Sequence, residues 1–183
     1  MRWITQQEAA RLIQEAERYA SRPHLAAFIR LALNTGCRKG ELLNLEWSRV
    51  YPDHRQFLLE ARHTKARRRR TVPLNDAALD ALRHMQAWQQ GRGLISPWVF
   101  GYDEGKRIMS FKTAWTAALR RAKIENFRIH DLRHTFASWL VMQGESIYVV
   151  KDLLGHASVT QTERYAHLAP DQGRGAVQRL PLF

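Results

Sequence analysis

Residues 130–140, with the sequence HDLRHTFASWL, are the stretch from which both the fold and the chemistry of this chain can be predicted. If they form a helix with about 100° per residue, the apolar side chains fall on one stripe: Leu132, Phe136, Trp139 and Leu140. His130 and Arg133 project from another face, about 60° apart. An imidazole beside a permanent cation suits an anion that also exchanges a proton, and phosphate is the first candidate. Taken alone, the pair is more simply explained as part of an ordinary buried amphipathic helix with an incidental polar face.

The overall charge indicates a polyanionic partner. The chain of 183 residues has 29 Lys and Arg against 17 Asp and Glu, a net charge of +12 and a pI near 10.7. Such a balance points to nucleic acid or to an anionic membrane surface. No apolar run approaches the roughly 20 residues of a spanning helix, and the N-terminus lacks the apolar core of a signal peptide. We therefore expect nucleic acid as the partner, no membrane, and the cytoplasm as the compartment.

Cysteine usage and length limit the architecture. Cys37 is the only cysteine, so an internal disulfide and a CxxC-type metal site are both excluded. The length suits one domain with a proper core.

Apolar spacing and capping residues predict a mainly helical chain. Thr5 and Glu8 form a capping box at the first helix, and Gly36 and Gly155 end two later ones. The predicted helices cover residues 5–19, 23–35, 38–45, 75–90, 110–123, 130–143 and 147–154. Ser158 and Gln161 form a second capping box, which places Tyr165 in the second turn of a final short helix.

The period of the apolar residues changes between positions 47 and 74. Short apolar runs at 57–59 and 71–74 predict a small antiparallel sheet, with a basic hairpin at 65–70. Loop 91–105 has room for one short strand, at 98–100. The expected fold class is therefore α+β, mainly α with a small antiparallel β-sheet.

Two cationic segments are candidates for binding phosphate. Arg38, in TGCRKGELL, follows a helix-breaking turn and lies at a helix start, where free N–H groups favour an oxyanion. The alternative is a surface ion pair with Glu41. Lys65 begins the run KARRRR, and an ammonium among cations has the lowered pKa that a proton donor to a leaving alkoxide needs. The alternative is a merely solvated charge run.

Two further residues lie near the C-terminal end. His156 follows a predicted helix end in LLGH, and Tyr165 occurs in TERYAHL. A phenol with a pKa of about 10 becomes a nucleophile only when cations stabilise its phenolate. A loop histidine and a packing tyrosine are the simpler interpretations.

The spacing of His130 and His134 superficially imitates the zinc motif HExxH. Asp131 replaces the glutamate that acts as base, and Arg133 would place a fixed cation beside the metal. We therefore predict no metal site.

In combination these motifs resemble the signature of the tyrosine recombinases, the phage integrase family. The resemblance extends in order over residues 5–168. It implies the catalytic-domain fold of that family for residues 1–170, and a tail at 171–183 that docks in cis or on a neighbouring subunit. It also implies that the family's N-terminal core-binding domain is absent from this chain.

The resemblance implies a role for each motif. Tyr165 attacks a DNA phosphate and forms a 3′-phosphotyrosine. Arg38 and Arg133 bind the non-bridging oxygens, and His156 donates a further hydrogen bond. The remaining implied residues are Lys65 as acid, His130 as base, Glu41 as support, and Lys39, Arg67, Arg68, Arg69 and Arg70 as DNA contacts.

The implied function is site-specific DNA recombination or integration without a metal ion or other cofactor. The implied partners are double-stranded DNA and further copies of the chain, as a synaptic tetramer on DNA and a monomer or weak oligomer when free. The implied source is bacterial or phage, with the protein associated with the nucleoid. Two alternatives use the same residues: DNA relaxation of the type IB topoisomerase kind, and a non-catalytic DNA-binding regulatory module.

Overall fold

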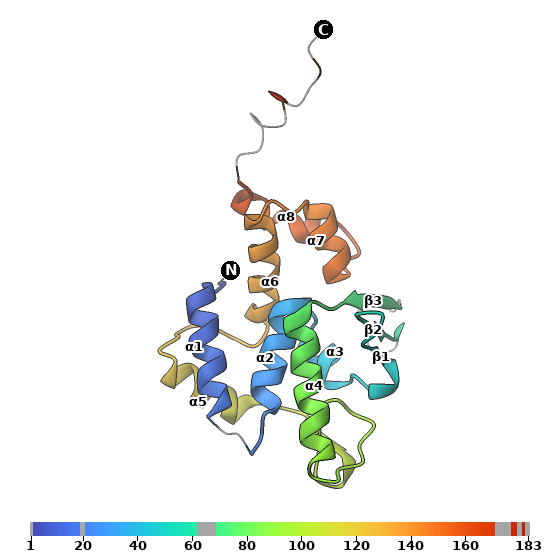
Figure 1. The fold of residues 1–183 in the computed structure, drawn as a ribbon. Helices are drawn as coiled ribbons and strands as arrows, with labels where there is room; N and C mark the ends of the chain where they lie inside the picture. The colour runs from blue at the N-terminus through green and yellow to red at the C-terminus, as the bar shows by residue number, and fades with distance from the viewer. Residues whose placement is uncertain (1, 19–20, 62–68, 171–176, 179–180, 182–183) are drawn as a thin grey trace. The chain divides into compact units, whose positions relative to one another are not determined.

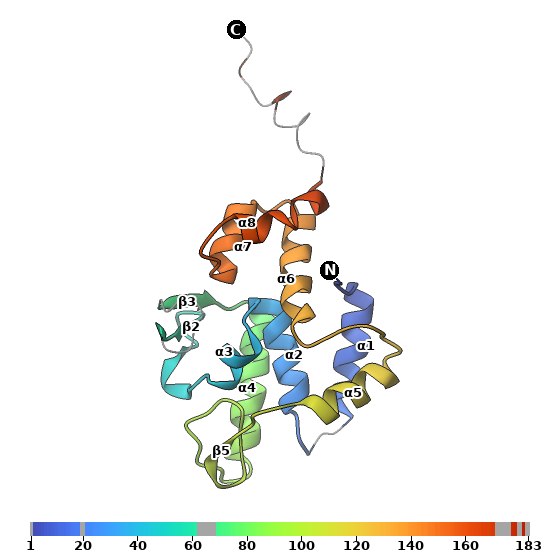
Figure 2. The same ribbon diagram turned by 180° about the vertical axis from the view of Figure 1, so that it is seen from behind.

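The computed structural model describes residues 2–18, 21–61, 69–170, 177–178 and 181. The chain forms two compact units, Met1–Phe136 (unit 1) and Ala137–Phe183 (unit 2), and each is described by itself. Figures 1 and 2 show the helices and strands of both units from opposite sides.

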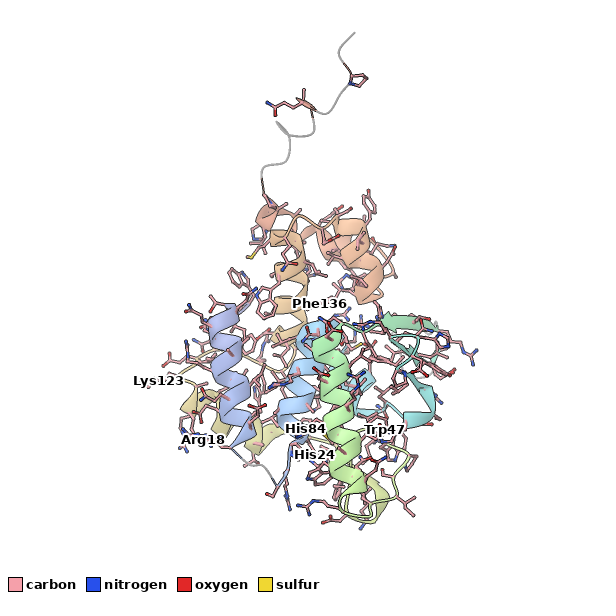
Figure 3. The ribbon with its side chains drawn as sticks, viewed as in Figure 1. Arg18, His24, Trp47, His84, Lys123 and Phe136 are labelled. Carbon is pink, nitrogen blue, oxygen red and sulfur yellow. The ribbon has the colours of Figure 1, made fainter. Side chains whose placement is uncertain are left out.

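Helix α2 (His24–Thr35) is the centre of unit 1. Almost all of its side chains are buried, because it packs against α1 (Gln6–Glu17) and α4 (Asp76–Gln90). Helix α5 (Lys112–Arg121) packs against α1. The side chains of unit 1 that surround these helices are drawn in Figure 3, where His24 of α2 and His84 of α4 are labelled. Phe28 of α2 meets Phe111 at a ring-centroid distance of 5.1 Å and Phe100 at 5.9 Å, which makes an aromatic core.

The predicted helix ends follow from local chemistry. The Thr5 hydroxyl accepts the Glu8 N–H, and the Glu8 carboxylate accepts the Thr5 N–H, so the capping box of α1 is confirmed. Asn75 caps α4 by accepting the Ala78 N–H. Gly36 ends α2 in the left-handed region at φ 62°, which only glycine adopts at little cost.

The three-stranded sheet of unit 1 is antiparallel, in the order β1–β2–β3. Its strands are β1 (Val50–Tyr51), β2 (Gln56–Leu59) and β3 (Arg70–Pro73), with Phe57 paired to Val72. The short helix α3 (Lys39–Leu43) and the 3₁₀ turn η1 (Trp47–Arg49) connect α2 to this sheet.

The strand predicted at 98–100 is wrong. The strands of this region are β4 (Gly101–Tyr102) and β5 (Lys106–Arg107), joined by the 3₁₀ turn η3 (Asp103–Gly105). Trp98 makes only an isolated bridge to Glu46. Val99 and Phe100 are fully buried, so their apolar character reflects packing in the core and not strand pairing.

Helix α6 (Asp131–Met142) begins in unit 1 and ends in unit 2. The two-sided pattern predicted for it is only partly correct. Leu132 and Phe136 are buried, but Trp139 and Leu140 are half-buried. Polar side chains are buried on it too, and Thr135 accepts the Ile4 N–H while donating to the Asp131 carbonyl.

Unit 2 also contains α7 (Ile147–Leu154), α8 (Thr160–Glu163) and the 3₁₀ turn η4 (Ala166–Leu168), and α7 packs against α8. The capping box predicted from Ser158 and Gln161 is wrong. The Ser158 hydroxyl accepts the Thr160 N–H, so helix α8 starts at Thr160 and makes no side-chain cap hydrogen bond.

The fold class is confirmed: the structure is mainly α with small antiparallel sheets. Helices α1 to α6 each begin and end within about two residues of their predicted bounds, which is the ordinary scatter of helix boundaries. Helix α7 matches its predicted span. Within the described ranges, no helix has both the length and the apolar character needed to cross a bilayer.

Candidate active site

The turn between α2 and α3 positions Arg38. Gly36 ends α2 in a left-handed conformation, and Arg38 is the N-cap residue of α3, with an extended backbone. Glu41, three residues later, accepts the Arg38 backbone N–H at 2.8 Å through Oε2. This local bond holds the backbone that carries the Arg38 side chain.

Glu41 binds two guanidinium groups. Its side chain is only 1% exposed; Oε1 accepts from Arg38 Nη1 at 2.9 Å, and Oε2 accepts from Arg70 Nη2 at 3.1 Å. The ion pair of Arg38 and Glu41 is thus present, but its carboxylate is buried and is shared with the first residue of β3. A buried carboxylate that serves two cations is a structural anchor for both.

Arg133 completes what we call the arginine cluster: Arg38, Arg70 and Arg133 around Glu41. Its side chain is 4% exposed, and Nη1 donates to the Gly36 carbonyl at 2.7 Å. Burial, and then the charge of Arg38, lowers the pKa of Arg133 to about 10. The guanidinium is still charged at neutral pH, although its surroundings disfavour the charge. A bound anion would therefore lower the free-energy cost of burying this charge.

His130 directly precedes α6 and is exposed. Partial desolvation of its ring, and then the charge of Arg133, lowers the pKa of His130 below the ordinary value. The imidazole is therefore neutral at physiological pH and can accept a proton. Its ring meets that of His134 edge to face, with centroids 4.9 Å apart.

The Asp131 carboxylate binds Arg128. It accepts the Arg128 backbone N–H at 2.8 Å and pairs with the Arg128 guanidinium. Burial alone would raise the pKa of Asp131, but these hydrogen bonds outweigh it and lower that pKa. In the described part of the chain, no group of three or more His, Cys, Asp or Glu side chains gathers where a metal ion could be held.

The predicted basic hairpin is only partly described. Lys65, Arg67 and Arg68 lie outside the described residues. Arg69 pairs with Glu60 at 3.1 Å with most of its side chain exposed, and Lys39 is exposed at the start of α3.

Unit 2 holds the other two predicted site residues. His156 follows Gly155, which ends α7 at φ 65°, and His156 Nδ1 lies 2.8 Å from the Thr162 hydroxyl oxygen. Tyr165 is buried, and its backbone N–H donates to the Thr162 carbonyl at 3.0 Å. The prediction that Tyr165 lies in the second turn of a helix is wrong, because α8 ends at Glu163 and η4 begins after Tyr165.

The structure thus brings Arg38, Glu41, His130 and Arg133 together in unit 1, and His156 and Tyr165 together in unit 2. Sequence reasoning missed two contributors. Arg70 was assigned only to DNA contact, although its position beside the apolar run of β3 signals a base residue of the hairpin and not its tip. Thr162, three residues before Tyr165, was not singled out.

Comparison with known proteins identifies the family of the chain. Residues 2–172 match the Phage integrase family. The integrase of Salmonella phage P22 is 37% identical over 93% of this chain and 45% of its own length. The integrase of Escherichia phage 186 is 31% identical over the whole chain and 48% of its own length. This chain therefore spans about half the length of the curated relatives it matches.

Solved structures agree with these relatives. The catalytic domain of bacteriophage HP1 integrase superimposes with a TM-score of 0.75 at 30% identity, covering 100% of this chain and 96% of that one. The XerH site-specific recombinase bound to palindromic difH substrate has the same fold, with a TM-score of 0.77 at 18% identity over 97% of this chain and 52% of that one. The chain belongs to the phage integrase family, and its fold is that of the catalytic domain of a tyrosine recombinase.

Proposed function

We propose that this domain cleaves and rejoins DNA strands through a covalent 3′-phosphotyrosine, and so carries out site-specific recombination or integration. The observation that carries the proposal is the buried Arg133 guanidinium, held beside Arg38 with its pKa lowered to about 10. Two guanidinium forks that converge without an equal number of carboxylates suit the negative charge that develops on phosphate oxygens during phosphoryl transfer.

Each side chain then has one task. Tyr165 attacks the phosphorus and its phenolic proton passes to the neutral imidazole of His130. Arg38 and Arg133 bind the two non-bridging oxygens, and His156 donates a hydrogen bond to one of them. The 5′-oxygen leaves as the Tyr165–phosphorus bond forms.

The leaving 5′-oxygen needs a proton, which we assign to Lys65. Glu41 keeps Arg38 in place. Lys39, Arg67, Arg68 and Arg69 contact the DNA backbone, where each cation displaces a counterion. Arg70, bound to Glu41, acts at the base of the hairpin, close to the cleaved phosphate.

The partner is double-stranded DNA. Positive charge dominates the chain, and the similar Tn1549 transposon integrase structure is described as in complex with a circular intermediate DNA. Strand exchange joins two duplexes, so we propose a synaptic tetramer on DNA, with residues 171–183 as the segment that docks in cis or on a neighbouring copy. Sedimentation with and without DNA tests this assembly, and a monomer on synapsed DNA would contradict it.

The decisive test is a covalent-adduct assay on a nicked suicide DNA substrate. The native chain should form a protein–DNA adduct that survives denaturation, and Tyr165→Phe should form none while binding DNA normally. Tyr148→Phe is the matched control, because Tyr148 is exposed on α7 and should leave the adduct unchanged.

The same assay separates metal-free strand cleavage from metal-dependent chemistry and from DNA binding without catalysis. Adduct formation should persist in EDTA, since the proposed chemistry uses guanidinium groups in place of a metal ion. If the native chain binds DNA but forms no adduct, the domain is a non-catalytic DNA-binding module. An adduct from Tyr165→Phe would show that the nucleophile is misassigned.

A further inference from the structure

Thr162 is a fully buried polar side chain to which no role has been given. Its exposed fraction is 0%, and its hydroxyl lies 2.8 Å from His156 Nδ1. Its carbonyl accepts the Tyr165 N–H at 3.0 Å. One residue therefore contacts the imidazole through its side chain and the nucleophile through its backbone.

The direction of the hydroxyl–imidazole hydrogen bond follows from what surrounds the hydroxyl. Within the described residues, His156 Nδ1 is the one hydrogen-bond partner of the Thr162 hydroxyl. A buried hydroxyl group must donate its hydrogen somewhere, because an unmade hydrogen bond leaves the full cost of desolvation. The Thr162 O–H therefore donates, and Nδ1 accepts.

An imidazole that accepts at Nδ1 carries its proton on Nε2. The opposite tautomer, with the proton on Nδ1, would leave the Thr162 hydroxyl hydrogen without an acceptor. The backbone of His156 is fixed independently, since its N–H donates to the Lys151 carbonyl at 3.0 Å. The hydroxyl of Thr162 thus favours the Nε2–H tautomer of the His156 ring.

We infer that Thr162 is a positioning residue that holds His156 in the Nε2–H tautomer, so that the ring presents an N–H donor to a phosphate oxygen. The tautomer follows from unit 2 alone, whereas its consequence for cleavage rests on the proposed function. A ring with its proton on Nδ1 would present a lone pair to the phosphate and repel it.

The first measurement needs no DNA. Long-range ¹H–¹⁵N correlation spectra of the full chain distinguish Nδ1–H from Nε2–H imidazoles, and a His156→Gln spectrum assigns the His156 signals. Native protein and Thr162→Ser should show the Nε2–H form. Thr162→Val, which keeps the shape but lacks the hydroxyl, should show a mixture of tautomers.

The matched control is Thr160→Val. Thr160 lies on the same helix but is exposed, and its hydroxyl contacts Ser158. This variant should leave the His156 tautomer and the cleavage rate unchanged.

The second measurement is single-turnover cleavage of a suicide substrate. Thr162→Val should lower the cleavage rate by about tenfold or more, as expected when the group that orients a histidine is removed. DNA affinity should stay the same, and Thr162→Ser should restore the rate.

The two measurements separate the possible failures. An Nδ1–H tautomer in the native protein overturns the inference even if Thr162→Val does not fold. A lost Nε2–H preference in Thr162→Val without any change in cleavage overturns the catalytic consequence. The absence of cleavage from every variant, including the native chain, defeats the proposed function and leaves the tautomer result standing.

Discussion

The arginine cluster of unit 1 and the Thr162–His156 contact of unit 2 hold polar groups in opposite ways. In the cluster, one buried carboxylate binds the guanidinium groups of Arg38 and Arg70, and Arg133 binds the nearby Gly36 carbonyl. Two of these contacts join distant segments: 29 residues separate Arg70 from Glu41, and 97 separate Arg133 from Gly36. In unit 2, a hydroxyl group contacts an imidazole ring six residues away.

Under the proposed function, this difference implies that the two regions contribute to phosphate binding in different ways. The cluster concentrates charge at an energetic cost, visible in the lowered pKa of Arg133, and therefore gains from binding an anion. The contact in unit 2 is not an ion pair, and it fixes only the direction of the hydrogen bond between Thr162 and His156. We expect substitution of the Glu41 anchor to lower stability, substitution of Arg133 to lower the cleavage rate, and substitutions in the second region to affect mainly the rate.

The largest expected effect is that of Arg133→Met. Removal of one preorganised phosphate-binding group should lower the cleavage rate by about a hundredfold to a thousandfold. Thermal stability should not fall, because the fold already disfavours the Arg133 charge. Single-turnover cleavage and calorimetry test both statements, and a variant that cleaves like the native chain would contradict the role of the cluster.

Glu41→Gln breaks the cluster at its anchor. An amide cannot balance the charges of Arg38 and Arg70, so the free energy of unfolding should fall by about 3 kcal/mol, the cost typical of breaking a buried ion pair. Urea titration measures the change. Asp76→Asn is the control, because the Arg55–Asp76 pair is exposed and should matter little. Equal losses from the two variants would mean that Glu41 is no special anchor.

The pH dependence of cleavage should reveal the state of His130. Burial and the charge of Arg133 lower the pKa of His130, so the ring is neutral above that value and protonated below it. A protonated ring cannot accept the Tyr165 proton. The cleavage rate should therefore stay constant as pH falls through about 6.5, the ordinary histidine value, and decline only at lower pH.

Arg133→Met sharpens this test. Because one cause of the shift is removed, an NMR titration between about pH 5 and pH 8 should show the pKa of His130 rising towards its ordinary value. An unchanged pKa would mean that the Arg133 charge does not reach the ring.

The smallest expected effect is on the salt dependence of DNA binding, and it distinguishes the arginines of the basic hairpin from Arg70 of the arginine cluster. Arg67→Ala with Arg68→Ala should reduce the slope of log binding constant against log salt by about 0.9 for each lost phosphate contact. Arg70→Ala should change the slope less and the cleavage rate more, since Arg70 binds Glu41. Filter binding at several salt concentrations gives the slopes, and equal slope changes per arginine would place Arg70 on the hairpin surface.

Local features were predictable because they depend on residues three or four apart. The Thr5–Glu8 capping box, the Asn75 cap and the glycine ends of α2 and α7 all follow from such neighbours. Two local predictions were nevertheless wrong, namely the capping box of Ser158 and Gln161 and the helical position of Tyr165. The wrong strand prediction has a different cause, which is burial. Residues 98–100 looked like a strand because they are apolar, but Val99 and Phe100 are apolar to fill the core.

The amino-acid sequence by itself determined where most helices begin and end and the α+β class, and it supplied the side chains on which the proposed chemistry rests. These follow from short-range hydrogen bonds, apolar spacing and residue type. Only the tertiary structure decided that Glu41 serves both Arg38 and Arg70, that Arg133 is buried with a lowered pKa, and that Thr162 faces His156. Burial and the charges around a group depend on segments that meet only when the chain folds, and no local pattern encodes them.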